Sequence, residues 1–292
     1  MGKKIAIVLT HGMGDISKSE FEDDIDQLSR AVEKRVGNNY SEILFKPVYF
    51  QDILQDNQNA VFKETKRESE IDWIKLRKFM LFSFSDAASL EHRAHQNNSV
   101  YCETQKRIFD SLVSVYDDLD VGSKNVIVVA HSLGCQVMSN YIWDSQSPTP
   151  TQGIWTTNHV GSIPDGSDLE SFVRLKGLKT LLTTGCNIPV FVAGRNRIQS
   201  IYTSSMGYSF EWHNFYDEDD VLGWPMRPLG KFFDPQERGV PYYDSVTYDH
   251  EINANGSLLG MFTKSWNPFS HGEYWQDKKF IKYLAGSIND YA

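Results

Sequence analysis

The stretch VIVVAHSLGCQVMSNYIWD, residues 126–144, places a strand pattern directly before a helix pattern. Its first five residues are apolar, a polar pair follows, and helical spacing begins at once. A continuous apolar run beside a helix is typical of a buried strand in a parallel sheet. So sharp a turn needs small side chains on both sides of Ser132, and Ala130 and Gly134 occupy those positions. The stretch therefore predicts an α/β fold with an abrupt strand–serine–helix junction.

The pentapeptide Ala130-His131-Ser132-Leu133-Gly134 matches the nucleophile elbow G-x-S-x-G, with Ala in place of the first Gly. Such a turn lifts the serine hydroxyl above the carboxyl end of the sheet and aims the Leu133 N–H at the same space. We expect His131 to line that space. The alternative is an ordinary turn in which serine caps a helix. The strand before it and the helix after it favour a nucleophile.

The rest of the chain repeats the alternation of short apolar runs and longer helical patterns. This predicts a mostly parallel sheet with helices on both faces. The expected strands are Ile5–Leu9, Ile43–Tyr49, Val126–Ala130, Lys179–Thr184, Glu211–Tyr216 and Ser245–His250, and the expected helices are 19–36, 100–118, 133–145 and 276–288.

Two long segments interrupt this rhythm, and we interpret both as excursions from a single domain over 1–292. Residues 52–98 are polar and helical in character around an aromatic centre, and are expected to be a helical insertion. The aromatic stretch 73–84 either forms a cap over Ser132 with an apolar acyl pocket or is the core of a helical hairpin. Residues 223–243 are rich in Pro, Gly and aromatics, which predicts an irregular loop.

A serine nucleophile needs donors for the negative charge that develops on the substrate's carbonyl oxygen. The first predicted strand ends in His11-Gly12-Met13-Gly14-Asp15, where glycines allow the backbone to bend and present N–H groups. We expect the Met13 N–H to be the second oxyanion donor, opposite that of Leu133. His11, Gly12 and Gly14 are expected to shape this loop beside the substrate, and His11 is not expected to be the base.

The nucleophile also needs an acid and a base from later loops. The segment DEDDVLGWP follows a predicted strand, and we favour Asp219 as the acid, with Asp217 and Asp220 as alternatives. For the base we favour His271, in a turn before the last predicted helix; His250, near a strand end, is the alternative.

The segments LTHGMGD, VVAHSLGC, TTGCNIPVF, NFYDEDDVLGWP and SHGEYW together resemble the α/β-hydrolase superfamily, in particular its lipase and esterase-like members. The resemblance extends over most of the chain. It implies Ser132 as nucleophile, His271 as base, Asp219 as acid, and Met13 and Leu133 as oxyanion donors. The chain departs from the family in three respects: the insertion over 52–98, Ala130 in the elbow, and a start at the strand that carries the His-Gly loop.

The expected activity is hydrolysis of a carboxylic ester through an acyl-enzyme, with no metal or cofactor. A thioesterase, amidase or acyltransferase would use the same residues, and a non-catalytic interaction protein would use none of them. A formal charge of −9 argues against nucleic acid as a partner, so the expected partner is a small ester or acyl compound. The absence of a long apolar stretch and the three scattered cysteines favour a cytoplasmic protein without a transmembrane segment.

Overall fold

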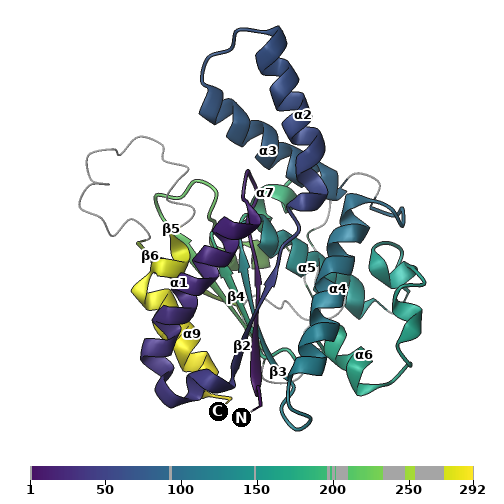
Figure 1. Ribbon diagram of the computed structural model, residues 1–292, viewed down its shortest axis with the longest axis vertical. Coiled ribbons are helices and arrows are strands. Elements are labelled where there is room, and N and C mark those ends of the chain that lie inside the picture. The colour runs from purple at the N-terminus through teal and green to yellow at the C-terminus, as the bar shows by residue number, and fades with distance from the viewer. Residues whose placement is uncertain are drawn as a thin grey trace.

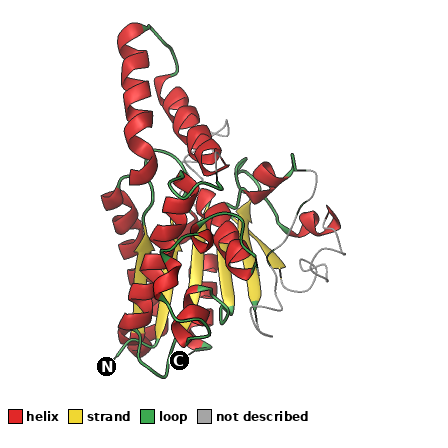
Figure 2. Ribbon diagram, turned by 90° about the vertical axis from the view of Figure 1, so that its right-hand side faces the viewer, coloured by secondary structure: helices red, strands yellow, loops and turns green. Residues whose placement is uncertain are grey.

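The computed structural model describes residues 2–91, 94–147, 149–195, 198, 201, 210–232, 247–253 and 273–291. Within these ranges six parallel strands form one sheet in the order β2-β1-β3-β4-β5-β6. Figure 2 shows the sheet between layers of helices. The strands are β1 (Ile5–Thr10), β2 (Ile43–Val48), β3 (Asn125–His131), β4 (Thr180–Thr184), β5 (Glu211–Asp217) and β6 (Thr247–Ile252).

The central strands are continuous apolar runs because both faces of the sheet are covered. Every residue of β1 is buried, as is every residue of β4. In β3 the five residues between Asn125 and His131 are buried. Side chains alternate between the two faces along each strand, so Val128 packs into one core and Ile127 and Val129 into the other.

Two layers of helices bury these two faces. Helices α1 (Lys18–Val36) and α9 (Lys278–Asn289) lie together on one face, where Phe21 and Phe280 are among the core residues. Helices α4 (Val100–Asp118), α5 (Leu133–Gln146), α6 (Asp168–Val173) and α7 (Ile188–Val192) belong to the other face (Figure 1). Helix α1 begins at a capping box, in which Ser17 and Glu20 satisfy each other's backbone N–H groups.

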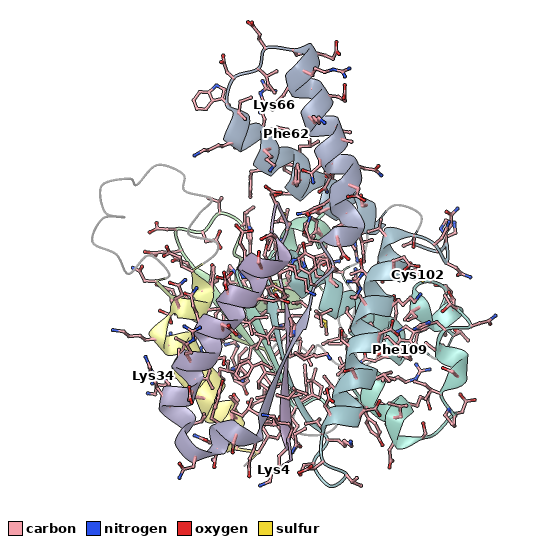
Figure 3. The ribbon with its side chains drawn as sticks, in the orientation of Figure 1. Lys4, Lys34, Phe62, Lys66, Cys102 and Phe109 are labelled. Atoms are coloured by element: carbon pink, nitrogen blue, oxygen red, sulfur yellow. The ribbon has the colours of Figure 1, made fainter. Side chains whose placement is uncertain are left out.

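Helices α2 (Asp52–Glu68) and α3 (Ile74–Glu91) form a hairpin that extends beyond the carboxyl ends of the strands. Figure 3 labels Phe62 on this hairpin, at the opposite end of the molecule from Lys4 beside β1. The ring of Phe62 lies 5.8 Å from Lys66 Nζ and 6.4 Å from the ring of the buried Phe82. The segment over 52–98, expected to be helical, thus contains two antiparallel helices.

The prediction of an α/β fold with a parallel sheet is confirmed, and all six expected strands are present with shifts at their ends. The last strand runs from Thr247 to Ile252, and residues 245–246 of the predicted range lie outside the described residues. Of the predicted loop over 223–243, the described part includes a 3-10 helix, η5 (Arg227–Phe232). None of the helices in the described ranges is long and apolar enough to span a lipid bilayer.

Candidate active site

Ser132 occupies an abrupt turn between β3 and α5. Its backbone angles are φ 52° and ψ −120°, a conformation with positive φ that a residue bearing a Cβ rarely adopts. The Ser132 N–H donates to the Thr184 carbonyl at 2.9 Å, and the Ser132 carbonyl accepts from Cys135 N–H at 2.9 Å. These two hydrogen bonds anchor the turn to the neighbouring strand and to the first turn of the helix, and so they offset its conformational strain.

Two glycines permit the chain to approach this turn closely. A Cβ at residue 134 would lie 2.5 Å from Thr10 Oγ1 and 2.6 Å from the His11 carbonyl oxygen. A Cβ at residue 12 would lie 2.8 Å from Ser132 Cβ and 3.2 Å from Ser132 Oγ. The loop after β1 thus packs directly on the serine, and Ser132 has no exposed surface.

His11 holds the loop after β1 in place through both of its ring nitrogens. Nδ1 donates to the Gly12 carbonyl at 2.7 Å and Nε2 accepts from the Phe50 N–H at 3.0 Å, which fixes a neutral ring. The ring is 2% exposed and stacks on Phe50 with centroids 3.9 Å apart. Burial lowers the pKa of His11 to about 4. His11 therefore shapes the loop, as expected, and presents no free nitrogen to a substrate.

The backbone N–H of Gly14 is hydrogen-bonded to a buried carboxylate of the hairpin. Gly14 N–H donates to Asp86 Oδ2 at 3.0 Å, and Gly14 has φ 109°. Asp86 is fully buried and also accepts from the side-chain amides of Gln51 and Gln58. Burial raises the pKa of Asp86. Of the two amides after Gly12, that of Met13 alone lacks a hydrogen bond within the described part of the chain.

Asn187, in the loop after β4, contacts the serine from another side. Its Nδ2 lies 3.4 Å from Ser132 Oγ, a long hydrogen bond. In the other orientation of its amide, Asn187 donates to the Ser132 carbonyl at 2.9 Å and accepts from the Leu133 N–H at 3.3 Å. The side chain is 1% exposed. Sequence analysis assigned it no role, although an asparagine just beyond a strand end at this edge of the sheet was a usable signal.

The ring of His131 lies between the loop after β1, where its Cδ2 would be 3.2 Å from a Cβ at residue 12, and the C-terminal part of the chain. Its Nδ1 lies 3.1 Å from both the carbonyl and the hydroxyl oxygen of Thr184. Its ring is 5.8 Å from that of Tyr274 and 6.1 Å from that of Trp275. His131 is half-buried, so it is part of the wall of the site.

The three candidate acids differ sharply in burial. Asp217 is 3% exposed at the end of β5, and Asp220 is 6% exposed, whereas Asp219 is exposed. The Tyr274 hydroxyl donates to Asp220 Oδ2 at 2.7 Å and accepts from the Asp217 N–H at 3.1 Å. The Asp219 N–H donates to Asp217 Oδ1 at 2.9 Å. Asp219, which the sequence favoured, thus lies exposed, whereas the Asp220 carboxylate and the Asp217 backbone N–H both meet the Tyr274 hydroxyl.

Tyr274 and Trp275 connect the acid segment with the serine. Trp275 Nε1 donates to Thr184 Oγ1 at 3.2 Å, beside the ring of His131. Burial and then the nearby carboxylates raise the pKa of Tyr274, so its phenol stays protonated. His271 lies outside the described residues.

The alternative base, His250, belongs to a different cluster. It lies on β6, three strand spacings from β3, or about 14 Å across the sheet. Its Nε2 is 3.0 Å from His213 Nδ1, and its ring stacks on Phe215. Burial and the neighbouring His213 lower the pKa of His250 to about 4. His250 is therefore packed against other side chains on the face of the sheet and does not lie at Ser132.

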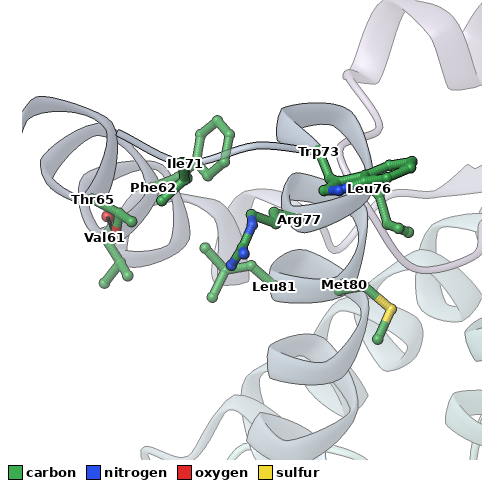
Figure 4. Close-up of a pocket in the computed structure, with 9 residues that line it drawn as sticks. All are labelled: Val61, Phe62, Thr65, Ile71, Trp73, Leu76, Arg77, Met80 and Leu81. Atoms are coloured by element: carbon green, nitrogen blue, oxygen red, sulfur yellow. Dashed lines mark hydrogen bonds between the residues drawn. The ribbon is translucent and has the colours of Figure 1, made fainter. Parts of the chain in front are cut away.

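The hairpin contains an apolar cavity of about 600 Å³ between α2 and α3 (Figure 4). All its lining residues belong to the hairpin, and they include Phe62, Trp73 and Met80. Trp73 is 76% exposed, whereas Phe82 is fully buried between the helices. The aromatic stretch 73–84 thus serves in part as the core of the hairpin and in part as its exposed surface. The expected role as a cap over Ser132 remains a prediction.

No known protein-family model matches this chain, and no curated protein has significant sequence similarity to it. The six-stranded parallel sheet defines the fold only as α/β, and the residues themselves must carry any assignment of function.

Proposed function

We propose that this protein is a serine hydrolase of the α/β-hydrolase type that cleaves carboxylic esters, with Ser132 as nucleophile. The observation that carries the proposal is the strained turn at Ser132, which has φ 52° at the carboxyl end of a buried strand and a glycine loop against its Cβ. Strain of about 1–3 kcal/mol persists where a structure requires it, and such positions cluster at active sites. A plain capping serine has extended backbone angles, as Ser17 and Ser99 do here.

The oxyanion hole is proposed from Met13 and Leu133. The Leu133 N–H is at the amino end of α5, where the helix dipole favours negative charge. Asp86 accepts from the Gly14 N–H, whereas the Met13 N–H has no acceptor within the described part of the chain and so is available to an oxyanion. In the alternative orientation of its amide, Asn187 accepts from Leu133 N–H, so an oxyanion would replace the Asn187 oxygen as acceptor.

We propose Asp220 as the acid, in place of Asp219. An orienting carboxylate is buried and held by hydrogen bonds. Asp220 meets both conditions through Tyr274 and the Leu222 N–H, which donates at 2.9 Å. The exposed Asp219 meets neither. Asp217 is the second candidate because it is also buried, at the end of β5 directly before the same loop.

His271 remains the proposed base. Chain connectivity limits its Cα to about 11 Å from that of Tyr274, and Tyr274 contacts both Asp220 and His131. His271 would take the Ser132 proton as Oγ bonds to the ester carbonyl carbon. It would then return that proton to the alcohol oxygen as the carbon–oxygen bond breaks. Water, activated by the same ring, would release the acid from the acyl-enzyme.

Ser132 is covered in this structure, so substrate entry requires that the loop over residues 11–15 or its neighbours move off Oγ. We therefore expect small reagents to react faster than bulky ones of equal intrinsic reactivity. The test is labelling by fluorophosphonates, a methyl-sized one and a biotinylated one, on wild type and Ser132→Ala. Labelling of wild type alone would support the proposal, and absence of labelling by either reagent would overturn it.

The same residues would serve a thioesterase, an amidase or an acyltransferase. Parallel assays with butyryl ester, thioester and anilide substrates of matched chain length distinguish these activities. A non-catalytic interaction protein would have no use for a strained serine beside an oxyanion loop, and it would leave all three substrates intact.

A further inference from the structure

One face of α5 is polar although most of that helix is buried. Gln136, Ser139, Asn140 and Trp143 follow the spacing i, i+3, i+4, i+7 and so share one face. All four line a largely enclosed cavity of about 230 Å³ between α5, α7 and the start of α4. Of the four, Gln136 is buried and the others are half-buried, and a buried hydrogen-bonding group is costly unless something satisfies it.

This cavity lies near the proposed nucleophile, although Ser132 is not itself among the residues that line it. Gln136 follows Ser132 by four residues, about one helical turn or roughly 6 Å along α5. From the opposite wall, Ile188 directly follows Asn187, whose amide nitrogen is 3.4 Å from Ser132 Oγ. Two separate elements therefore connect the cavity with the serine.

Gln136 indicates what the cavity would bind. The side chain is 4% exposed, and its Nε2 donates to Asn140 Oδ1 at 3.1 Å. Its Oε1 is buried and has no hydrogen-bond partner among the described residues. Leaving a buried carbonyl unpaired costs about 1–3 kcal/mol. A ligand with hydroxyl donors would remove this cost.

The rest of the lining is mostly uncharged, which suits a hydroxyl-bearing group. Arg195 also lines the cavity and already takes part in another interaction. Ser139 and Asn140 offer a hydroxyl and an amide, and Gln152 reaches the cavity from the loop after α5. Gln152 is itself held by Tyr101, to whose hydroxyl it donates at 3.2 Å. Ile188 and Val192 supply apolar walls for carbon atoms. The volume corresponds to about seven or eight water molecules, enough for a small polyol.

We propose that this cavity is the subsite for the alcohol portion of the substrate and that the preferred alcohol is a small polyol. This inference rests on the proposed ester hydrolysis at Ser132. The hairpin cavity is lined almost wholly by apolar side chains, whereas this one presents amides and hydroxyls, so the two differ in the ligand that they favour.

The experiment compares glycerol monobutyrate with ethyl butyrate, which share an acyl group. We expect wild type to have the higher kcat/KM for the glycerol ester. Ser139→Leu, which fills the cavity and removes a hydroxyl, should lower the ratio of the two kcat/KM values at least tenfold. Ser139→Ala, which only removes the hydroxyl, should lower it by about threefold. Ser111→Leu, on α4 away from the cavity, is the matched control and should leave the ratio unchanged.

The polyol subsite would be overturned if the ratio were the same in wild type and Ser139→Leu, as it is when kcat/KM falls by the same factor for both esters. If fluorophosphonates label wild type while the ratio stays constant, the subsite fails and the proposed function stands. If wild type is not labelled and hydrolyses neither ester, the proposed function fails and the subsite fails with it.

Discussion

Gly14 N–H donates to Asp86 Oδ2 at 3.0 Å across 72 positions of sequence, and this contact joins the loop beside the proposed nucleophile to the α2–α3 hairpin. Lys78 on the hairpin also pairs with Asp15 in the same loop. The hairpin is therefore part of the support for the proposed oxyanion loop.

Asp86→Leu should disturb that loop strongly because it removes the acceptor of the Gly14 N–H and of the Gln51 and Gln58 amides. Of these, the Gln58 amide keeps its hydrogen bond to Ser85 Oγ. We expect a loss of about 3 kcal/mol in the free energy of unfolding and a fall in kcat with little change in KM. Urea denaturation and ester kinetics measure the two effects. Lys78→Met, which removes the partly exposed pair, should cost less than about 1 kcal/mol. Equal effects of the two substitutions would contradict the role given to Asp86.

The acid is tested by a series of single substitutions. Asp220→Asn should reduce the labelling rate by a factor on the order of 10³–10⁴, because a carboxylate is needed to hold the base in the correct tautomer. Asp219→Asn should change it by less than about twofold, because that side chain is exposed. Asp217→Asn decides between the buried candidates: a larger loss than in Asp220→Asn would transfer the role to Asp217.

Backbone strain at residue 132 should lower the free energy of unfolding. Glycine adopts φ near 52° without a Cβ penalty, so Ser132→Gly should unfold with a free energy about 1 kcal/mol higher than Ser132→Ala. Both variants lack the nucleophile, so the comparison isolates the backbone. Chemical denaturation measures the difference, and an equal stability would show that the turn is not strained.

Close packing under the elbow makes Gly134 intolerant of a methyl group. Gly134→Ala places a Cβ against Thr10 Oγ1 and the His11 carbonyl, and we expect a loss of about 2–3 kcal/mol together with most of the labelling. Gly286 on α9 is the matched control, since a Cβ there meets nothing within 4 Å. Gly286→Ala should raise stability by about 0.5–1 kcal/mol. Thermal and urea unfolding of the two variants tests this contrast.

The buried His11 should make stability depend on pH. Its pKa is about 4 in the folded protein against an ordinary 6.5, so the unfolded chain binds the proton first as pH falls. The contribution of neutral His11 to the free energy of unfolding is complete above pH 6.5. It is lost as pH falls to about 4, a total loss of roughly 3 kcal/mol. In His11→Gln the unfolding free energy should vary less over this window. An NMR titration that places the His11 pKa near 6.5 would contradict this prediction.

The strands and the elbow could be predicted because each is encoded in a few adjacent residues. Val126 to Ala130 are apolar in an unbroken run, and the small residues around Ser132 follow from local geometry. The acid could not be chosen in the same way. Asp219 and Asp220 are adjacent in an acidic turn. What distinguishes them is the hydrogen bond that Asp220 accepts from the hydroxyl of Tyr274, 54 positions further along the chain. The roles of Asp86 and Asn187 likewise depend on contacts across the fold that no spacing pattern records.

Both ends of the chain lie at the pole of the molecule where the strands begin, whereas Ser132, the glycine loop and the hairpin lie where the strands finish (Figure 1). A tether fused to either terminus would therefore leave the pole that holds the proposed nucleophile facing outward. Surface immobilisation through an N- or C-terminal tag should therefore preserve access of large reagents to this pole. The same orientation suits single-molecule work on the proposed movement of the loop over residues 11–15.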